Sequence, residues 1–173
     1  PAGAQIVDVE LTLSMSRATG PASEIGVHRV LADWGEGASD ASGEEGGGAP
    51  SAPGDATWIH TFYDGALWSN PGGDFEADPA AVALVGDLGF YTWSSSAMVS
   101  DVQAWLDDAS TAFGWALLGD EAGFGTTKRF DTRENADAAL RPVLRVEYVI
   151  PAPSALAALA VAGLAGARRR RDA

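Results

Sequence analysis

The segment Gln5–Ser16, with the sequence QIVDVELTLSMS, decides the fold. From Val7 to Met15 every second residue is apolar, and the residues between them are Asp8, Glu10, Thr12 and Ser14. Successive side chains of a strand point to opposite faces, so a period of two predicts a strand with one buried and one wet face. Strands of this kind are typical of antiparallel sheets. The segment therefore favours an all-β fold.

The same alternation returns near the other end of the chain, in Pro142–Ile150. Between the two segments we expect a turn at 17–21 and further short strands at 25–31, 57–63, 82–93, 113–118 and 126–131, with the strand at 113–118 buried on both faces. The 82–93 segment is either one strand broken at Gly86–Asp87 or a hairpin. One helix is predicted at Ser96–Asp107, where apolar residues follow a helical period and Ser94, Ser95 or Ser96 can cap the start. Many short strands with one helix predict an antiparallel β-sandwich or jelly roll.

Charge and composition exclude several classes of function. The chain has 173 residues, 46% of them hydrophobic, and a net charge of −13; its last six residues carry +3, which leaves −16 on the rest. A body this acidic repels phosphate backbones, so we expect no nucleic-acid partner. The chain has no Cys. Disulfides, thiolate metal sites and a Cys nucleophile are therefore excluded.

The last segment, 151–173, differs in kind from the body at 1–150. Pro151-Ala152-Pro153 is followed by thirteen apolar residues, Ala155–Ala167, and then by Arg168, Arg169, Arg170 and Arg171. A stable membrane span needs about 20 residues, so this run predicts a hydrophobic helix that enters a membrane only transiently, with a permanent, marginal anchor as the alternative. The arginines are expected on the cytoplasmic side.

This order of features resembles a PEP-CTERM sorting signal, in which Pro151 and Pro153 open the motif and Arg168–Arg171 close it. In that family the middle residue is often Glu, where this chain has Ala152. The resemblance implies recognition by an exosortase-type membrane protease and cleavage near Pro151–Pro153. It also implies export in a bacterium, with the helix in the inner membrane before processing and the product at the cell surface or in an extracellular matrix.

The body resembles the DNRLRE-domain family over roughly 9–148. The segments that carry the resemblance are Ala32–Gly37 (ADWGEG), Gly54–Trp58 (GDATW), Trp68, Pro71–Asp74 (PGGD), Val99, Val102, Trp105-Leu106, Phe113–Trp115 (FGW), Phe130–Asn135 (FDTREN) and Arg141–Leu144 (RPVL). The resemblance implies a jelly roll like those of carbohydrate-binding modules, with no common catalytic apparatus. The family's first strands would precede Pro1, so we expect this chain to be a fragment or a processed product.

Tryptophans near loops are the candidate ligand-binding residues. Aromatic faces bind the apolar faces of sugar rings, and Trp34, Trp58 and Trp68 lie in or beside predicted loops. A polysaccharide is the partner that this hypothesis predicts. The alternative is that these residues plug the end of the sandwich under the long loop. Trp105 and Trp115 fit the pattern of core residues.

The acidic residues of the long loop, 35–56, indicate calcium as a candidate cofactor. Asp40, Glu44, Glu45 and Asp55 offer hard oxygen ligands on a flexible segment, as Ca²⁺ sites require. The alternative is a solvated acidic loop, because the chain has no Asp-x-Asp-x-Asp-Gly sequence.

Catalysis has little support in the sequence, and we expect no enzyme. The only histidines, His28 and His60, are predicted to lie in strands, and no Gly-x-Ser-x-Gly elbow is present. Arg133 and Glu134 are expected to tie a loop to the sheet, with a ligand-binding Arg as the alternative. The sequence thus predicts a non-catalytic exported surface or matrix module. The alternative is a carbohydrate-binding module of a larger polysaccharide-acting enzyme.

Overall fold

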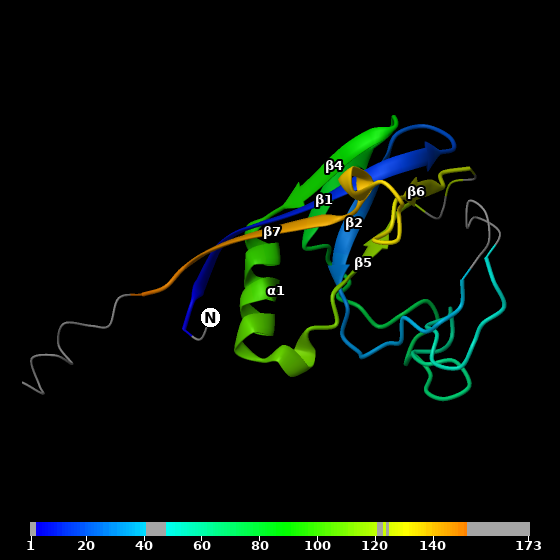
Figure 1. The fold of residues 1–173 in the computed structure, drawn as a ribbon, viewed down its shortest axis with the longest axis horizontal. Helices are drawn as coiled ribbons and strands as arrows, with labels where there is room; N and C mark the ends of the chain where they lie inside the picture. Colours follow the sequence, from blue (N-terminus) through cyan, green and yellow to red (C-terminus); the bar gives the residue numbers. More distant parts are fainter. Residues whose placement is uncertain (1–2, 41–47, 121–122, 124, 152–173) are drawn as a thin grey trace, which may run out of the picture.

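The protein folds into two antiparallel sheets and one short α-helix, seen in a computed structural model that describes residues 3–40, 48–120, 123 and 125–151 (Figure 1). The elements in chain order are β1 (Gln5–Ala18), β2 (Ser23–Arg29), β3 (Ala81–Val85), β4 (Gly89–Ser94), α1 (Ser96–Asp107), η1 (Ala109–Thr111), β5 (Trp115–Leu118), β6 (Lys128–Phe130), η2 (Ala138–Leu140) and β7 (Val143–Val149). The predicted all-β sandwich with one helix is confirmed at this level.

Strand β1 is the centre of the first sheet. Strand β4 pairs with one of its edges through Glu10–Met15, and β6 and β7 share the other edge. The predicted period of two is confirmed in β1, where Val9, Leu13 and Met15 are buried. The register shifts between Ile6 and Asp8, so the alternation does not continue unbroken to the start of the strand.

Strands β6 and β7 follow one line along β1. The residues of β6 pair with Met15–Ala18 and those of β7 with Gln5–Thr12, both antiparallel to β1. The chain therefore leaves the edge after Phe130, makes an excursion over 131–142 and returns at Val143. The sequence predicted both strands, β7 from its alternation, but not that they continue one another.

The second sheet has the order β3-β2-β5 and packs on the first (Figure 1). The core between them contains Val9, Leu13 and Met15 of β1, Ile25 and Val27 of β2, Val85 of β3, Trp93 of β4 and Met98 of α1. Trp93 is 1% exposed, and its Nε1 donates a hydrogen bond of 2.9 Å to Ile25 O, which links the two sheets. Strands β3 and β4 do not form a hairpin with each other, because they belong to different sheets.

Helix α1 has the predicted bounds and one of the predicted caps. Ser95 Oγ accepts a hydrogen bond of 3.0 Å from Met98 N, and Met98 is fully buried. At the other end of the helix, Gln103 Oε1 accepts 2.9 Å from Ile6 N, which ties the helix to β1.

Three predictions of local structure are wrong. Residues 57–63 form no strand, because Thr57 Oγ1 accepts hydrogen bonds from Ile59 N and His60 N and folds the segment into a turn. Strand β5 is not buried on both faces: it is an edge strand, and Leu117 is exposed. The expected turn at 17–21 begins later, because β1 continues to Ala18.

The predicted sorting tail lies almost entirely outside the residues that the structure describes. Pro151 follows β7, while Pro153, the apolar run and Arg168–Arg171 lie outside the described residues. No helix among those described is long and apolar enough to cross a membrane.

Candidate functional site

A lobe of turns extends beyond the ends of β2 and β5 and holds the predicted binding residues. We name residues 32–40 and 48–74 the loop lobe; in Figure 1 it is the cyan to blue-green part of the ribbon. The lobe is held together by backbone hydrogen bonds between turns and not by a sheet. Among these bonds are Gly35 N to Thr61 O at 2.9 Å and Tyr63 N to Asp55 O at 2.7 Å. The lobe is thus a defined structure although it contains no regular strand in its described part.

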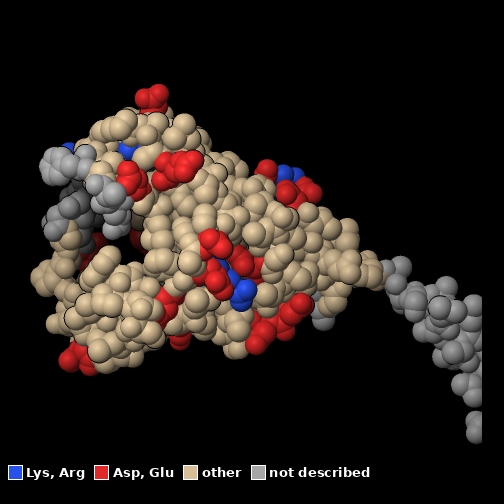
Figure 2. Space-filling model, turned by 180° about the vertical axis from the view of Figure 1, so that it is seen from behind, with Lys and Arg blue, Asp and Glu red and all other residues tan. Residues whose placement is uncertain are grey.

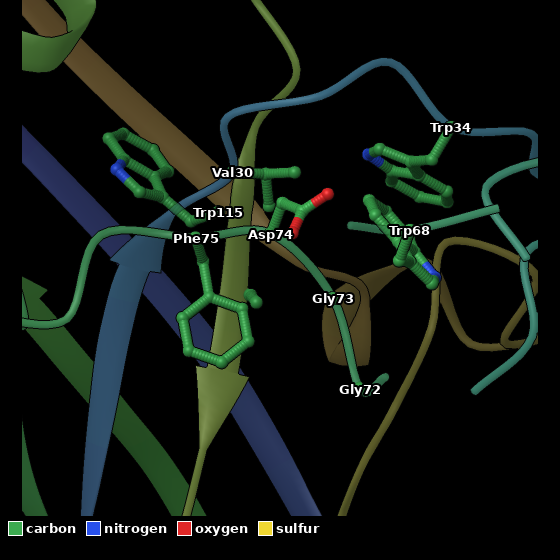
Figure 3. A pocket seen from close by; sticks show the side chains of 9 residues that line it. Val30, Trp34, Trp68, Gly72, Gly73, Asp74, Phe75 and Trp115 are labelled. Atoms are coloured by element: carbon green, nitrogen blue, oxygen red, sulfur yellow. The ribbon is translucent and has the colours of Figure 1, made fainter. Parts of the chain in front are cut away.

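A pocket lies where the loop lobe meets the end of the second sheet (Figure 3). Its volume is about 240 Å³, and its lining consists of Val30, Trp34, Trp68, Gly72, Gly73, Asp74, Phe75, Trp115 and Ala116. Eight of these residues are apolar or glycine, and Asp74 is the only charged one. Figure 3 shows Trp34 and Trp68 together on one side, with Val30 and Phe75 across from them.

The second sheet continues into the floor of this pocket. Val30 follows β2 and pairs with Phe75 in an isolated antiparallel bridge, and Leu31 N donates to Asp74 O at 2.8 Å. On the other side, Val30 N donates to Gly114 O at 3.0 Å. Segments that are between 43 and 84 residues apart in sequence therefore meet in a hydrogen-bonded frame.

Trp34 and Trp68 are both held by their indole N–H groups. Trp34 Nε1 donates 2.8 Å to Phe113 O, and Trp68 Nε1 donates 2.9 Å to Thr57 O. Trp34 remains 41% exposed. Because the polar end of each ring is occupied, its flat apolar face is the part left for a ligand. The structure thus brings together two of the three predicted binding residues.

Asp74 shapes the wall of the pocket. Its Oδ2 accepts 2.7 Å from Ser69 N, and its Oδ1 accepts from both the backbone N and the side-chain Nδ2 of Asn70. These donors, Ser69 N–H first, hold the pKa of Asp74 below its usual value. The carboxylate is therefore ionised at neutral pH and fixed in a tight turn.

Glycines in the same turn allow a close approach of the backbone to Trp58. Gly72 has φ +100°, and a Cβ at this position would lie 2.9 Å from the Trp58 ring. Gly72 N also donates to Trp58 O at 2.6 Å. Trp58 itself is 66% exposed and does not line the pocket, so it is separate from the pair formed by Trp34 and Trp68.

Trp115 is fixed from behind by helix α1. Its Nε1 donates 2.8 Å to Asp101 Oδ2, and its ring lies 4.5 Å from that of Trp105. Asp101 also forms an ion pair of 3.6 Å with Arg29 of β2. Trp105 and Trp115 were predicted to be core residues, but both are only half-buried, and the tryptophan of the main core is Trp93.

The acidic residues predicted to bind calcium do not come together in the described part of the loop. Asp55 is 4% exposed, and its carboxylate accepts hydrogen bonds from Ala38 N, Ser39 N and Ala52 N. The Ala52 N–H is the main cause of its lowered pKa. Asp40 is exposed, and Glu44 and Glu45 lie outside the described residues.

Metal ligands are not clustered elsewhere in the part of the chain that the structure describes: it contains no group of three or more His, Asp or Glu side chains that could hold an ion. Asp55 is explained without a metal, because its oxygens already bind three backbone donors and so fold the loop around it. The calcium hypothesis stays a prediction for the remaining residues.

The two histidines have structural partners. His28 is buried in β2, where its Nδ1 donates 2.9 Å to Glu76 O and its ring packs edge-on against Phe75. His60 lies outside the named strands, contrary to the prediction, and its Nδ1 is 2.9 Å from Thr57 Oγ1. Neither ring lines the pocket.

Arg133 connects the 131–142 excursion to the loop lobe. It forms ion pairs of 2.8 Å with Glu36 and 2.7 Å with Glu134. The sequence predicted a contact that ties a loop to the sheet, whereas the contact found joins two loops. Both partners are well exposed, so its contribution is to position the loops more than to stabilise the fold.

The surface around these elements is acidic. Figure 2 shows many Asp and Glu side chains on the face seen from behind, with few Lys and Arg among them. A neutral ligand approaches such a surface without penalty, whereas a polyanion is repelled. The arrangement of the pocket therefore suits a small neutral ligand with an apolar face.

Sequence reasoning missed Asp74, Phe75 and the role of Asp101. The turn sequence around Gly72–Asp74 was a signal for Asp74, but only the long-range bridge from Val30 to Phe75 shows that this turn reaches the pocket.

No family model matches the chain, and comparisons with curated proteins and with solved structures find no match.

Proposed function

We propose that this chain is a non-catalytic module that is exported to the bacterial cell surface or extracellular matrix. It binds one sugar unit of a polysaccharide in the pocket between the loop lobe and the end of the second sheet. The observation that carries the proposal is the pair Trp34 and Trp68, whose indole N–H groups are bound to backbone carbonyls while their rings line the pocket. Rings locked in this way lose little entropy when a ligand packs against them.

The size and chemistry of the pocket support a sugar unit. Its volume of about 240 Å³ is below the roughly 300 Å³ at which pockets for drug-sized ligands begin, so it has room for one small ring. Pyranose rings combine an apolar face with hydroxyl groups. The tryptophan faces match the first, and the ionised Asp74 can accept a hydrogen bond from the second.

Several features of the site argue against catalysis. Asp74 is the only ionisable side chain in the lining, and its lowered pKa prevents it from acting as a general acid near neutral pH. Glycosidases need a pair of carboxyl groups about 5–10 Å apart across the bound sugar, and the lining supplies one.

Export and sorting are proposed from the tail. The Pro151–Pro153 motif, the apolar run and Arg168–Arg171 resemble a PEP-CTERM signal, and an exosortase-type membrane protease would cleave near the prolines after a transient membrane insertion. For the body we propose the DNRLRE-like jelly roll. The two packed antiparallel sheets support it, as does the grouping of Trp34, Trp68 and Gly72–Asp74 around one pocket.

The same pocket would serve a carbohydrate-binding module of a larger polysaccharide-acting enzyme, and the sequence upstream in the full-length protein separates this reading from a stand-alone matrix module. A catalytic domain in the same polypeptide would favour the enzyme-borne module.

Binding is tested on a glycan array, followed by titration calorimetry with the best oligosaccharide. Trp34→Ala and Trp68→Ala are each expected to weaken binding by about tenfold or more, which corresponds to about 1.4 kcal/mol. Trp58→Ala is the matched control, because Trp58 is exposed and outside the lining; it should bind as the wild type does. Circular dichroism shows whether each variant remains folded. Equal losses in all three folded variants, or no glycan bound by the wild type, would refute the sugar site.

Sorting is tested by mass spectrometry of the protein from its native host. The expected surface form ends near Pro151–Pro153, and replacement of Arg168–Arg171 by Ala should impair processing. Intact Arg168–Ala173 on the surface-exposed form would contradict the sorting proposal.

A further inference from the structure

Strand β7 is an edge strand with an unusual exposure. It pairs with β1 on one side, and no other described strand pairs with its second edge. Val146 packs against the core, but the other apolar side chains of the strand and the next residue are between 48% and 64% exposed: Val143, Leu144, Tyr148, Val149 and Ile150. A long edge with this much apolar surface is a template for pairing with another strand.

Two residues that often protect edge strands, Lys and Pro, are missing from β7. Its sequence VLRVEYV contains no Lys and no Pro, and its only charges are Arg145 and Glu147. These two side chains form an ion pair with each other, and Arg145 Nη1 also lies 3.0 Å from Glu10 Oε2. No net charge therefore repels an approaching strand of the same kind.

The sequence of β7 is complementary to itself when two copies run antiparallel about Val146. In this register Arg145 of each copy faces Glu147 of the other, Leu144 faces Tyr148, Val143 faces Val149, and Val146 faces its own copy. The two members of each pair are an even number of residues apart along the strand, namely two, four and six. Their backbone groups therefore point to the same edge, as an antiparallel ladder requires.

We propose that two copies of this chain associate through the free edges of β7, in a symmetric antiparallel pair centred on Val146. The first sheets of the two copies then form one continuous sheet in the order β4-β1-β7-β7-β1-β4. Two opposite-charge pairs and the apolar cross-strand pairs set the register.

The other outer strands lack this self-complementary pattern of charges. Strands β3, β4 and β5 contain no charged residue, and β6 contains two cations side by side. The pairing is also limited in length, because the 131–142 excursion ends where β7 begins. A partner strand can thus follow β7 over its seven residues and no further.

The proposal is tested by reversing the charges, with sedimentation velocity of the full chain in a mild detergent that shields the apolar tail. The wild type is expected to be a dimer. Arg145→Glu places four carboxylates across the two-fold axis, and Glu147→Arg places four guanidinium groups there. Each variant alone should dimerise about tenfold more weakly or worse. Mixed in equal amounts, they should form a heterodimer, because every cross-strand pair then joins opposite charges.

The control is Glu24→Arg, which makes the same charge change as Glu147→Arg at an exposed position of β2 and should leave the dimer intact. A monomeric wild type, or single variants that dimerise as the wild type does, would overturn the proposal. Single variants that stay monomeric on mixing would overturn it as well. That result would mean that the substitutions damage the fold and do not act through pairing of opposite charges across the two β7 strands.

Discussion

Trp93→Phe is the substitution that best tests the sandwich itself. Trp93 belongs to β4 in the first sheet, and its indole N–H donates to Ile25 O of β2 in the second. The residue is 1% exposed, and its ring packs edge-on against that of Phe130, with 5.8 Å between centroids. A phenyl ring keeps much of this apolar contact but cannot donate the hydrogen bond.

The expected loss follows from these contacts. A buried carbonyl left without its donor costs about 1–3 kcal/mol. The smaller ring also leaves unfilled space in a core that cannot fully collapse, which adds about 1 kcal/mol. The free energy of unfolding should therefore fall by about 2–4 kcal/mol. This is a large share of the roughly 5–15 kcal/mol of a typical domain, and it lowers the melting temperature by about 4–16 °C.

The assay is urea unfolding followed by far-ultraviolet circular dichroism. The midpoint should fall while the slope with urea stays constant, which shows that stability and not the denatured state has changed. Trp58→Phe makes the same chemical change at a residue that is 66% exposed, and it should alter the free energy of unfolding by less than about 0.5 kcal/mol. If the two substitutions have similar effects, Trp93 does not link the sheets and the reasoning fails.

Two further predictions concern the loop lobe. Gly72→Ala should weaken glycan binding in titration calorimetry and also lower the melting temperature, because Ala is strained at φ +100° and its Cβ meets the Trp58 ring, which displaces the turn; unchanged affinity would contradict this. Asp55→Asn should destabilise the protein at pH 7, because an amide NH₂ replaces an oxygen that accepts backbone N–H groups. The pKa of Asp55 lies below its ordinary value of 3.8, so the carboxylate stabilises the fold above about pH 4 and this advantage is lost as the pH falls through the lowered pKa. Melting temperatures of both proteins should therefore converge in acid, and a constant difference down to pH 2 would show that the charge is unimportant.

Local patterns in the sequence predicted the scaffold well. Strands β1 and β7 followed from the period of two, and helix α1 followed from its apolar spacing and Ser95. Each of these signals depends on neighbours within one turn or one strand, which is why a single sequence contains them. The turn at Thr57 was missed because a side-chain hydroxyl there binds backbone groups that a strand would have used.

The candidate site could be predicted only in part. The positions of Trp34 and Trp68 in loops followed from their neighbours, but their meeting in one pocket depends on pairing between Val30 and Phe75, which are 45 residues apart in sequence. Alternation does not say which strands become neighbours. For the same reason the core tryptophan was misassigned: Trp93 faces the second sheet, whereas Trp115 is held at its margin by Asp101.

The pocket is better understood as an extension of the second sheet than as a feature of the loops. Strand β2 ends at Arg29, yet its hydrogen bonding continues through Val30 to Gly114 and through Leu31 to Asp74. Two walls of the pocket are therefore fixed to the extension of β2, and Trp34 is bonded to Phe113 O beside one of them, while Trp68 is bonded to Thr57 O within the loop lobe. Changes at the tip of the long loop should leave the pocket intact. Changes at the end of β2 should move both walls at once, because one strand holds them in register.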